Sequence, residues 1–223
     1  MSVAAVSAPT SPFKGLAPFD DTPVDALFFF GREREIEVMV ANVMANRLTV
    51  LYGPSGVGKT SLLRAGLAQR LREDPEALVV PFSSWAGDAV PELLDAIERA
   101  ALAAAGEQSL EPVRRNGSLA DALALWTRRL GRDVYLVLDQ LEEYFLYHEG
   151  ESGPGTLLDE LPEVLRRTGL RANFLVGIRE DALAQLDAFK GRIPNLFAAT
   201  LRLDRLDRGA GEAAILGPIR EYN

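Results

Sequence analysis

One stretch of eight residues constrains the fold of this chain most: GPSGVGKT at 53–60. It matches the pattern G-x-x-x-x-G-K-[ST], in which glycines let main-chain N–H groups approach phosphate oxygens. A buried strand is predicted directly before it by the apolar, β-branched run RLTVLY at 47–52. A helix is predicted directly after it, because Leu63, Leu67 and Leu71 recur one turn apart. A glycine-rich loop between a strand and a helix cradles phosphates, so the sequence predicts a nucleotide-binding fold.

Strand and helix patterns alternate along the rest of the chain. Four further apolar runs predict strands at 77–82, 133–139, 173–178 and 199–203. Apolar residues at helical spacing predict helices within 36–43, 90–97, 119–130, 157–165 and 181–189, and from Asp207 onward. Strands that alternate with amphipathic helices form βα units. The predicted fold class is therefore α/β: a P-loop fold with a mainly parallel five-stranded sheet and helices on both faces.

Composition excludes several kinds of site. The chain has no cysteine and a single histidine, His148, so disulfides, cysteine or histidine metal clusters and a Ser-His-Asp triad are excluded. His148 itself is predicted to be a solvated loop residue. The formal net charge of −8 offers no broad basic surface for nucleic acid, although a local basic patch stays open. No apolar run approaches the roughly 18 residues of a membrane span. The first residues lack the pattern of a signal peptide, so a cytoplasmic protein is expected.

The loop residues have specific expected roles. The Lys59 ammonium is expected to reach the β- and γ-phosphates, where it would act in binding and in catalysis. The Thr60 hydroxyl is expected to ligate Mg²⁺. The N-terminus of the following helix would face the anion. The cofactors predicted from this loop are therefore ATP or ADP together with Mg²⁺.

Acidic residues end the predicted strand 133–139, in the run VYLVLDQLEE. Asp139 would lie at the carboxyl edge of the sheet beside the loop, so we interpret it as a Mg²⁺ ligand rather than a helix cap. Hydrolysis also needs a group that accepts a proton from water, and Gln140 cannot do so. Glu142 and Glu143 are the nearest candidate bases. We favour Glu143, and both alternatives stay open.

Four further positions are candidates for the nucleotide pocket. Arg179 follows the apolar strand 173–178 and could contact the γ-phosphate, or it could pair with Glu180 or Asp181. Arg32 could line the pocket, with Phe30 and Gly31 near the base, or it could be a solvated charge at a helix start. No N-K-x-D guanine signature occurs, so adenine is favoured.

Together these segments resemble the STAND class of P-loop NTPases, in particular its bacterial "novel STAND" branch. The matching runs are FKGLAPFDD, FFFGRERE, VLYGPSGVGKTSLLRAGLAQRLR, VYLVLDQLEE and FLVGIRED, and they cover about residues 12–181. The RAGL run and the D-Q-x-E-E run are more specific than the phosphate loop alone. One departure is EDALAQLD after Arg179, which lacks an aromatic residue expected after the aspartate.

The resemblance implies an ASCE-type core with strand order 5-1-4-3-2 and an ATP-operated switch, in which Gln140 belongs to the family pattern. It also implies that Arg179 senses the γ-phosphate and that Pro218 packs near adenine. The residues expected to bind nucleotide are Phe30, Gly31, Arg32, Gly53, Pro54, Ser55, Gly56, Val57, Gly58, Lys59, Thr60, Ser61 and Pro218. Relatives carry an effector and a repeat-built sensor, and many act in bacterial signalling or antiphage defence.

The expected organisation has four parts: a flexible tail (1–12), a linker and helix (13–46), the NTPase core (47–205) and the start of a helical subdomain (206–223). We expect the chain to be a piece of a longer protein. The favoured function is a slowly hydrolysing regulatory ATPase whose nucleotide state sets conformation or homo-oligomeric assembly. The alternatives are a replication-initiator or loader ATPase acting on DNA, and a small-molecule kinase.

Overall fold

A five-stranded parallel sheet forms the centre of the protein, in the order β2-β3-β4-β1-β5. The computed structural model describes residues 11, 13–106 and 117–222. The strands are β1 (Leu48–Gly53), β2 (Ala77–Phe82), β3 (Asp133–Leu138), β4 (Ala172–Arg179) and β5 (Thr200–Arg202). This is the predicted order read from the other edge, and each strand lies within one residue of its predicted bounds. The predicted fold class is confirmed.

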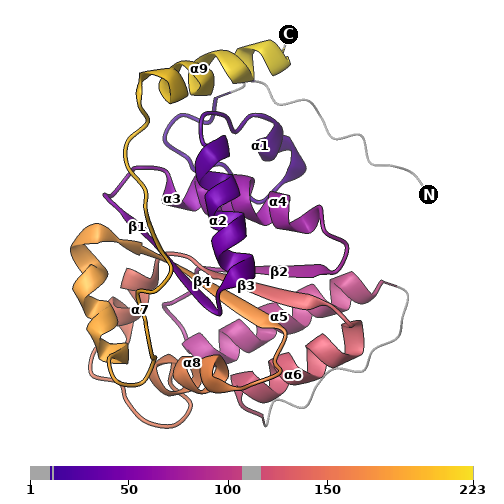
Figure 1. Ribbon diagram of the computed structural model, residues 1–223, viewed down its shortest axis with the longest axis vertical. Coiled ribbons are helices and arrows are strands. Elements are labelled where there is room, and N and C mark those ends of the chain that lie inside the picture. Colours follow the sequence, from indigo (N-terminus) through magenta and orange to yellow (C-terminus); the bar gives the residue numbers. More distant parts are fainter. Residues whose placement is uncertain (1–10, 12, 107–116, 223) are drawn as a thin grey trace.

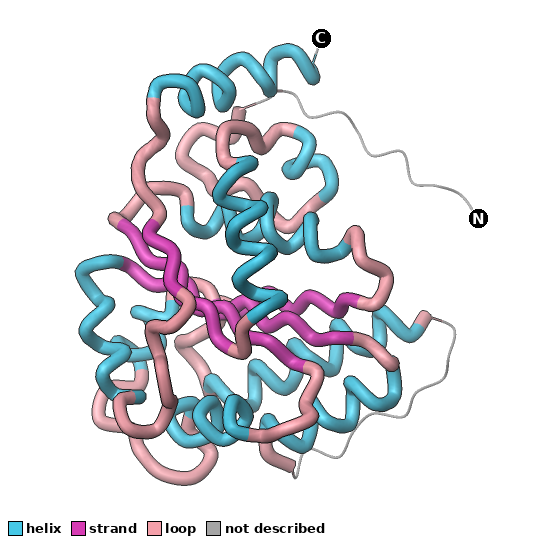
Figure 2. The backbone as a smooth tube through the Cα atoms, viewed as in Figure 1, coloured by secondary structure: helices cyan, strands magenta, loops and turns pink. Residues whose placement is uncertain are grey.

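Helices cover both faces of the sheet (Figure 1, Figure 2). On one side lie α2 (Glu33–Ala45) and the helix after the phosphate loop, which runs through α3 (Lys59–Ser61), the π-helical η1 (Leu62–Ala68) and α4 (Gln69–Arg72). On the other lie α5 (Ala89–Ala105), α6 (Leu119–Leu130) and α8 (Leu157–Arg166). The remaining elements are α1 (Pro23–Leu27), α7 (Leu141–Tyr147), η2 (Glu180–Phe189) and α9 (Arg208–Tyr222).

Strands β1 to β4 divide their side chains between two cores, whereas β5 contributes only Leu201, to one of them. Along β3, Val134, Leu136 and Leu138 face the core under α5, α6 and α8. The alternate residues Tyr135 and Val137 face the core under α2 and the phosphate-loop helix. This two-residue alternation with both faces buried is the reason that the strands read as continuous apolar runs in the sequence.

Two helices differ from expectation. The predicted helix 181–189 forms the 3₁₀ helix η2, where Leu183, Leu186 and Phe189 recur every third residue. That spacing matches the three residues per turn of a 3₁₀ helix, in which side chains at i and i+3 eclipse. Residues 23–27, where no helix is predicted, form α1, because Thr22 caps its N-terminus and Pro23 occupies the first turn.

Three further expectations concern the tail and the division of the chain, membrane-spanning helices, and His148. The predicted tail at 1–12 lies outside the described residues apart from Ser11, and the division at 46, 205 and 206 stays a prediction. Among the described residues, no helix combines the length and the apolar character that crossing a membrane requires. The interpretation of His148 as a solvated loop residue is wrong, because its side chain is only 8% exposed and both ring nitrogens are bonded.

α9 packs directly on the segment before α2. A Cβ placed on Gly31 would lie 2.3 Å from the Ala210 carbonyl oxygen, and one on Gly217 would lie 2.4 Å from the Phe30 ring. The rings of Phe28 and Tyr222 also meet, with centroids 6.5 Å apart. Gly31 in addition has a φ of +86°, which L side chains rarely adopt.

We predict that Gly31→Ala lowers the free energy of unfolding by about 3 kcal/mol, through left-handed strain plus overpacking against a main-chain carbonyl. Gly191→Ala is the matched control: its φ is +75° but no atom lies within 4 Å of the added Cβ. The control should lose only about 1 kcal/mol, the strain alone. Urea unfolding of both variants measures this. Equal losses would contradict the close packing of α9.

Candidate functional site

A cavity of about 970 Å³ lies at the carboxyl edge of the sheet, where the phosphate loop, the acidic cluster and the N-terminal segment meet. Loop residues 55–61 form its floor, and Asp139, Glu142 and Glu143 line it from the β3 side. Arg179 lines it from the end of β4. Residues from four separate predicted segments are thus brought to one place, as expected for the carboxyl edge of a parallel sheet.

The loop is curled by two left-handed glycines, Gly56 (φ +72°) and Gly58 (φ +96°). Gly58 also caps the N-terminus of α3, so the loop leads straight into the helix. The Lys59 ammonium donates to the carbonyl oxygens of Gly53 (2.9 Å) and Pro54 (3.0 Å), across the loop. Burial lowers the pKa of Lys59, while the charges of Glu142 and Asp139 oppose that shift. An ammonium in this position can turn to an incoming phosphate.

Asp139 is the most buried acid at the site, with 3% of its surface exposed. Its Oδ1 accepts the Gln140 main-chain N–H (2.9 Å), whereas its buried Oδ2 has no hydrogen-bond partner. Burial raises the pKa of this carboxyl, and the hydroxyl of Thr60 and the charge of Arg64 counter it in part. A buried carboxylate oxygen without a hydrogen-bond partner lowers the stability of the fold unless a bound cation takes the place of that partner.

The residues fit a magnesium ion shared with a nucleotide. Among the described residues, no group of three or more acidic or histidine side chains could hold a metal by itself. Mg²⁺ prefers one or two protein oxygens plus phosphate oxygens, and the free Oδ2 of Asp139 with the neighbouring Thr60 hydroxyl offers that set. Asp139, Glu142 and Glu143 also place three carboxylates on the cavity wall, so a triphosphate would need a cation to enter.

The two candidate bases make different contacts. The Gln140 side-chain amide donates to Glu143 Oε1 (3.1 Å), and Gln140 itself is held at φ +56°, a left-handed conformation unusual for a side-chain-bearing residue. Burial raises the pKa of Glu143, helped by the charges of Glu142 and Asp139. Glu142 instead accepts the Arg179 main-chain N–H at the end of β4 (3.2 Å).

Of the two interpretations of Arg179, the pair with Asp181 is confirmed and the contact with a γ-phosphate stays a prediction. Arg179 lines the cavity, and its guanidinium pairs with Asp181 through Nε (3.0 Å) and Nη2 (2.5 Å). That pairing and the main-chain bond to Glu142 hold the residue at the mouth of the site. To contact a γ-phosphate, the exposed guanidinium would have to break its ion pair with Asp181, or bind Asp181 and the phosphate at the same time.

Arg32 is not the solvated charge considered as an alternative, because only 6% of it is exposed. Its Nη2 donates to the carbonyl oxygens of Val57 (3.2 Å) and Asp204 (2.8 Å), and its Nη1 pairs with Glu35 (2.6 Å). The guanidinium therefore ties the phosphate loop to the chain after β5. It borders the cavity, but both of its terminal nitrogens already donate to the protein.

Apolar side chains also line the cavity: Phe28, Phe29, Phe30, Leu146, Leu206 and Ala214. The segment 13–19 forms a further wall that the sequence did not lead us to expect, although it belongs to the FKGLAPFDD run. It is held by the Phe19 N–H bonded to the Ser61 hydroxyl (3.1 Å). Of the other predicted residues, Gly31, Gly53, Pro54 and Pro218 do not line the cavity; Pro218 is buried within α9.

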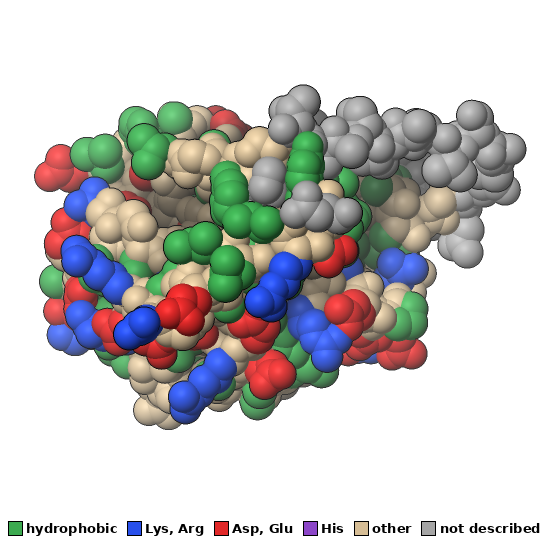
Figure 3. Space-filling view, turned by 90° about the horizontal axis from the view of Figure 1, so that it is seen from above, with side chains coloured by type: hydrophobic (Ala, Val, Ile, Leu, Met, Phe, Trp, Pro, Cys, Tyr) green, Lys and Arg blue, Asp and Glu red, His purple; other side chains and the backbone are tan. Residues whose placement is uncertain are grey.

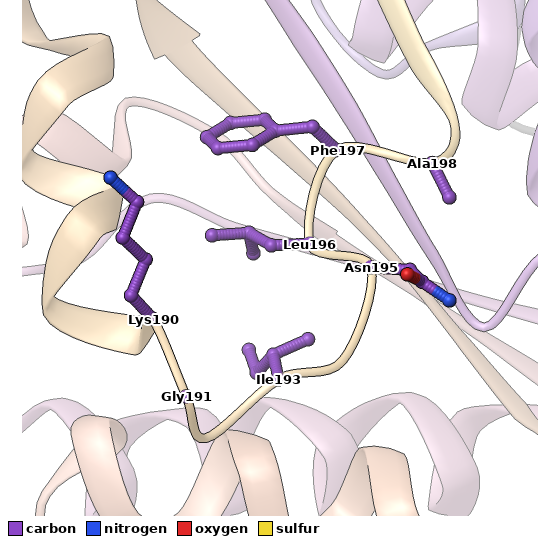
Figure 4. Close-up of a pocket in the computed structure, with 7 residues that line it drawn as sticks. All are labelled: Lys190, Gly191, Ile193, Asn195, Leu196, Phe197 and Ala198. Atoms are coloured by element: carbon purple, nitrogen blue, oxygen red, sulfur yellow. The ribbon is translucent and has the colours of Figure 1, made fainter.

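A second cavity, of about 420 Å³, lies between η2 and β5, away from the phosphate loop. Figure 4 shows Lys190, Leu196 and Phe197 gathered around its opening, while Asn195 points the other way. Its one charged lining group, the Lys190 ammonium, is paired with Asp187 at 2.7 Å. This cavity has none of the converging polar groups of the first.

Comparison with known proteins gives one family and several structural neighbours. A model of the family "Novel STAND NTPase 1" matches residues 12–223. Curated proteins gave no match. A Walker-type ATPase of Pyrococcus abyssi superposes with a TM-score of 0.64 at 18% identity, over 92% of this chain and 61% of that protein.

Two origin-recognition proteins of Aeropyrum pernix are also similar. ORC2, in ADPNP and ADP complexes, gives a TM-score of 0.63 at 15% identity over 94% of this chain and 55% of its own. ORC1, in complex with DNA, gives 0.58 at 21% identity over 89% and 52%. The chain therefore spans little more than half the length of these neighbours. At such identities the likeness concerns the fold.

Proposed function

Because this chain belongs to the novel STAND NTPase 1 family, we propose that its carboxyl-edge cavity binds Mg²⁺–ATP and hydrolyses it slowly, as a regulatory switch. The observation that carries this proposal is the convergence of Lys59 and Thr60 with Asp139, whose buried Oδ2 lacks a partner. Adenine is proposed for the apolar side of the cavity, on the absence of a guanine signature.

The phosphate-binding role falls to the loop. The main-chain N–H groups of 55–60 and the Lys59 ammonium would bind the β- and γ-phosphates, in a pocket where charge-assisted hydrogen bonds are strong. Thr60 and Asp139 would hold Mg²⁺, which neutralises phosphate charge when bound. Arg32 would keep the loop in its curled form through the Val57 carbonyl.

The water-activating role is assigned to Glu143. Its pKa is raised by burial and by the acids beside it, which makes its carboxylate a better proton acceptor. The Gln140 amide holds it but also competes for its oxygen. Because the base is four positions after the metal ligand and shares its lone pairs with an amide, slow turnover is expected. Slow turnover suits a switch whose ATP and ADP forms differ in conformation or assembly.

We predict that Glu143→Gln reduces ATP turnover by about a hundredfold or more and leaves ATP binding within about twofold, as removal of a general base does. Glu142→Gln is the matched control on the same helical turn, and it should retain most of the turnover. Phosphate release and equilibrium ATP binding, measured separately, check this. A larger loss in Glu142→Gln would transfer the base role to Glu142.

The wider role follows from the family resemblance alone. We propose that the module works in bacterial signalling or defence, in the cytoplasm, with sensor and effector regions in a longer chain and a homo-oligomeric active state. Arg179 keeps its proposed role at the γ-phosphate, and the proposed place of Pro218 near adenine rests on the resemblance alone, because Pro218 does not line the cavity. Measuring the mass of the chain in ATP and in ADP by light scattering tests the assembly part, and one mass in both nucleotides would contradict it.

The DNA-acting alternative has less support. The net charge is −8, and on the face drawn in Figure 3 basic and acidic side chains of the described residues are intermixed rather than gathered in a basic stripe. Salt-sensitive, ATP-dependent DNA binding would favour this alternative. Phosphoryl transfer to a metabolite would favour the kinase alternative.

A further inference from the structure

The main chain of Asp139 is held from two sides, by the last residue of β2 and by the segment that follows it. Its N–H donates to the Phe82 carbonyl oxygen (2.8 Å), and its carbonyl oxygen accepts the indole N–H of Trp85 (2.7 Å). Trp85 is fully buried and packs edge-on against Phe82 and Tyr144, with centroids 4.8 and 5.8 Å apart. The indole therefore fixes the peptide group that joins Asp139 to Gln140.

That peptide group determines which carboxylate oxygen of Asp139 stays available. The N–H of the same peptide, on Gln140, donates to Asp139 Oδ1 at 2.9 Å. Its carbonyl faces Trp85 and its N–H faces the carboxylate, so the two bonds set its orientation together. If the peptide rotated, Oδ1 would lose its donor and the carboxylate would no longer present Oδ2 alone to the cavity.

His148, at the end of α7, holds Trp85 in turn. Its Nε2 lies 2.8 Å from the Trp85 carbonyl oxygen, and its Nδ1 lies 2.9 Å from a carboxylate oxygen of Glu151. Both partners are acceptors, so both ring nitrogens must carry protons for both contacts to be hydrogen bonds. The ring also stacks on Tyr144 (4.9 Å between centroids, 25° between planes) and is only 8% exposed.

The charges around His148 favour the protonated ring. Burial by itself would lower the pKa, but the hydrogen bonds to Glu151 and to the Trp85 carbonyl outweigh it, and the charges of Glu151 and Asp88 add to them; the net pKa is raised. Glu151 lies in the turn after α7, and Asp88 directly precedes α5. Tyr144, on the ring's own helix, has its pKa raised by burial, so it contributes no charge at neutral pH.

We propose that His148 is a positioning residue: as an imidazolium joining Glu151 to the Trp85 carbonyl, it holds the indole that orients Asp139, so its deprotonation loosens the magnesium-binding carboxylate. A neutral imidazole has one N–H, and therefore either Glu151 or Trp85 loses its donor. Only the last link, from Asp139 to magnesium, rests on the proposed function.

The sign of the pH dependence follows from the raised folded-state pKa. The folded protein binds the His148 proton more tightly than the unfolded chain, whose histidine titrates near about 6.5. The stabilisation is fully present below about pH 6.5 and is lost as the pH rises through the folded-state pKa. The free energy of unfolding should fall over that window, and the fall should be absent in His148→Gln.

The first test is an NMR titration of the full chain without nucleotide or metal. The chain has one histidine and two tryptophans, so one imidazole and two indole N–H signals are followed. The imidazole should titrate above about 6.5. The Trp85 indole signal should move with the same midpoint, while that of Trp126, assigned through Trp126→Phe, should not. An imidazole midpoint at or below that value, or an unmoved Trp85 signal, would overturn the proposal.

Glu151→Gln provides a second variant that keeps the imidazole. It should lower the midpoint of the imidazole and of the Trp85 indole together, because one charged partner is removed. Glu149→Gln, an exposed acid in the same turn, is the matched control and should leave both midpoints in place. Equal shifts in the two variants would mean that general surface charge, and not the Glu151 contact, sets the midpoint, which contradicts the proposal.

The link to magnesium is tested by binding rather than by turnover. Calorimetry with a non-hydrolysable ATP analogue at varied Mg²⁺ should show the half-saturating Mg²⁺ concentration rising by about tenfold as His148 deprotonates, as outer-shell partners of metal ligands typically do. Glu151→Gln should shift that rise to lower pH. A Mg²⁺ requirement that stays constant while the NMR signals titrate would overturn the link. Failure to bind the analogue at every pH would contradict the proposed function instead.

Discussion

Replacing Lys59 with alanine is expected to weaken ATP binding by about tenfold to a hundredfold and to remove measurable turnover. The ammonium is the one charge in the loop, and a hydrogen bond to a charged group is worth about 1.5–3 kcal/mol, or roughly tenfold to a hundredfold in affinity. In hydrolysis the same group would face the growing charge on the transferred phosphate, so the loss of turnover should exceed the loss of binding. Calorimetry and phosphate release measure the two effects.

The fold of the Lys59→Ala variant needs its own check. The ammonium also joins the Gly53 and Pro54 carbonyls, so its removal frees both from that donor. We expect only a small loss in unfolding free energy, because a typical internal hydrogen bond contributes about 1 kcal/mol. Lys190→Ala is the matched control, an exposed lysine paired with Asp187 beside the second cavity. If Lys190→Ala weakened ATP binding as much, the binding site would lie elsewhere.

Asp139→Asn is expected to remove the contribution of Mg²⁺ to ATP binding and to make the protein more stable. The carboxylate is buried with Oδ2 lacking a partner, and burial raises its pKa, so the ionised form strains the folded state when no cation is present. Neutral asparagine removes that penalty, and a gain of about 1 kcal/mol is typical when a functional charge is neutralised. The same change removes the charge that would hold the metal.

Two measurements separate these effects. Urea unfolding without nucleotide or metal gives the stability change, and Asp133→Asn, an exposed acid at the other end of the same strand, is the control that should show no gain. Titration of ATP binding with Mg²⁺ gives the functional change. A less stable Asp139→Asn protein, or one with an unaltered Mg²⁺ response, would contradict the role assigned to Asp139.

The sheet and the position of the site could be predicted because their signals are local. Strands β1 to β4 are buried on both faces, so they appear as largely apolar runs, and the end of each run indicates which residue follows the strand. This rule predicts that Asp139 and Arg179 lie beside the phosphate loop. The 3₁₀ helix η2 and helix α1 also had local signals, the three-residue spacing and the Thr22-Pro23 pair, but these are weaker than the helical pattern.

The remaining details depend on contacts between distant segments. His148 and Trp85 are 63 residues apart, and no spacing in the sequence indicates that they meet. The wall formed by 13–19 depends on a bond from Phe19 to Ser61, and the burial of Arg32 depends on a carbonyl 172 residues away. Glu142 and Glu143 make different contacts after the left-handed turn at Gln140. A glycine would have indicated such a turn in the sequence, whereas a glutamine does not.

The measurement closest to the central claim is a pair of experiments on one preparation: equilibrium binding of ATP with and without Mg²⁺, followed by phosphate release at saturating Mg²⁺–ATP. The account predicts Mg²⁺-dependent binding at one site per chain, and turnover well below the roughly 10 s⁻¹ of a median enzyme. In Lys59→Ala, turnover should vanish and ATP binding should weaken by about tenfold to a hundredfold. Binding that ignores Mg²⁺ and stays at full strength in Lys59→Ala would contradict the account, as would turnover at or above that median.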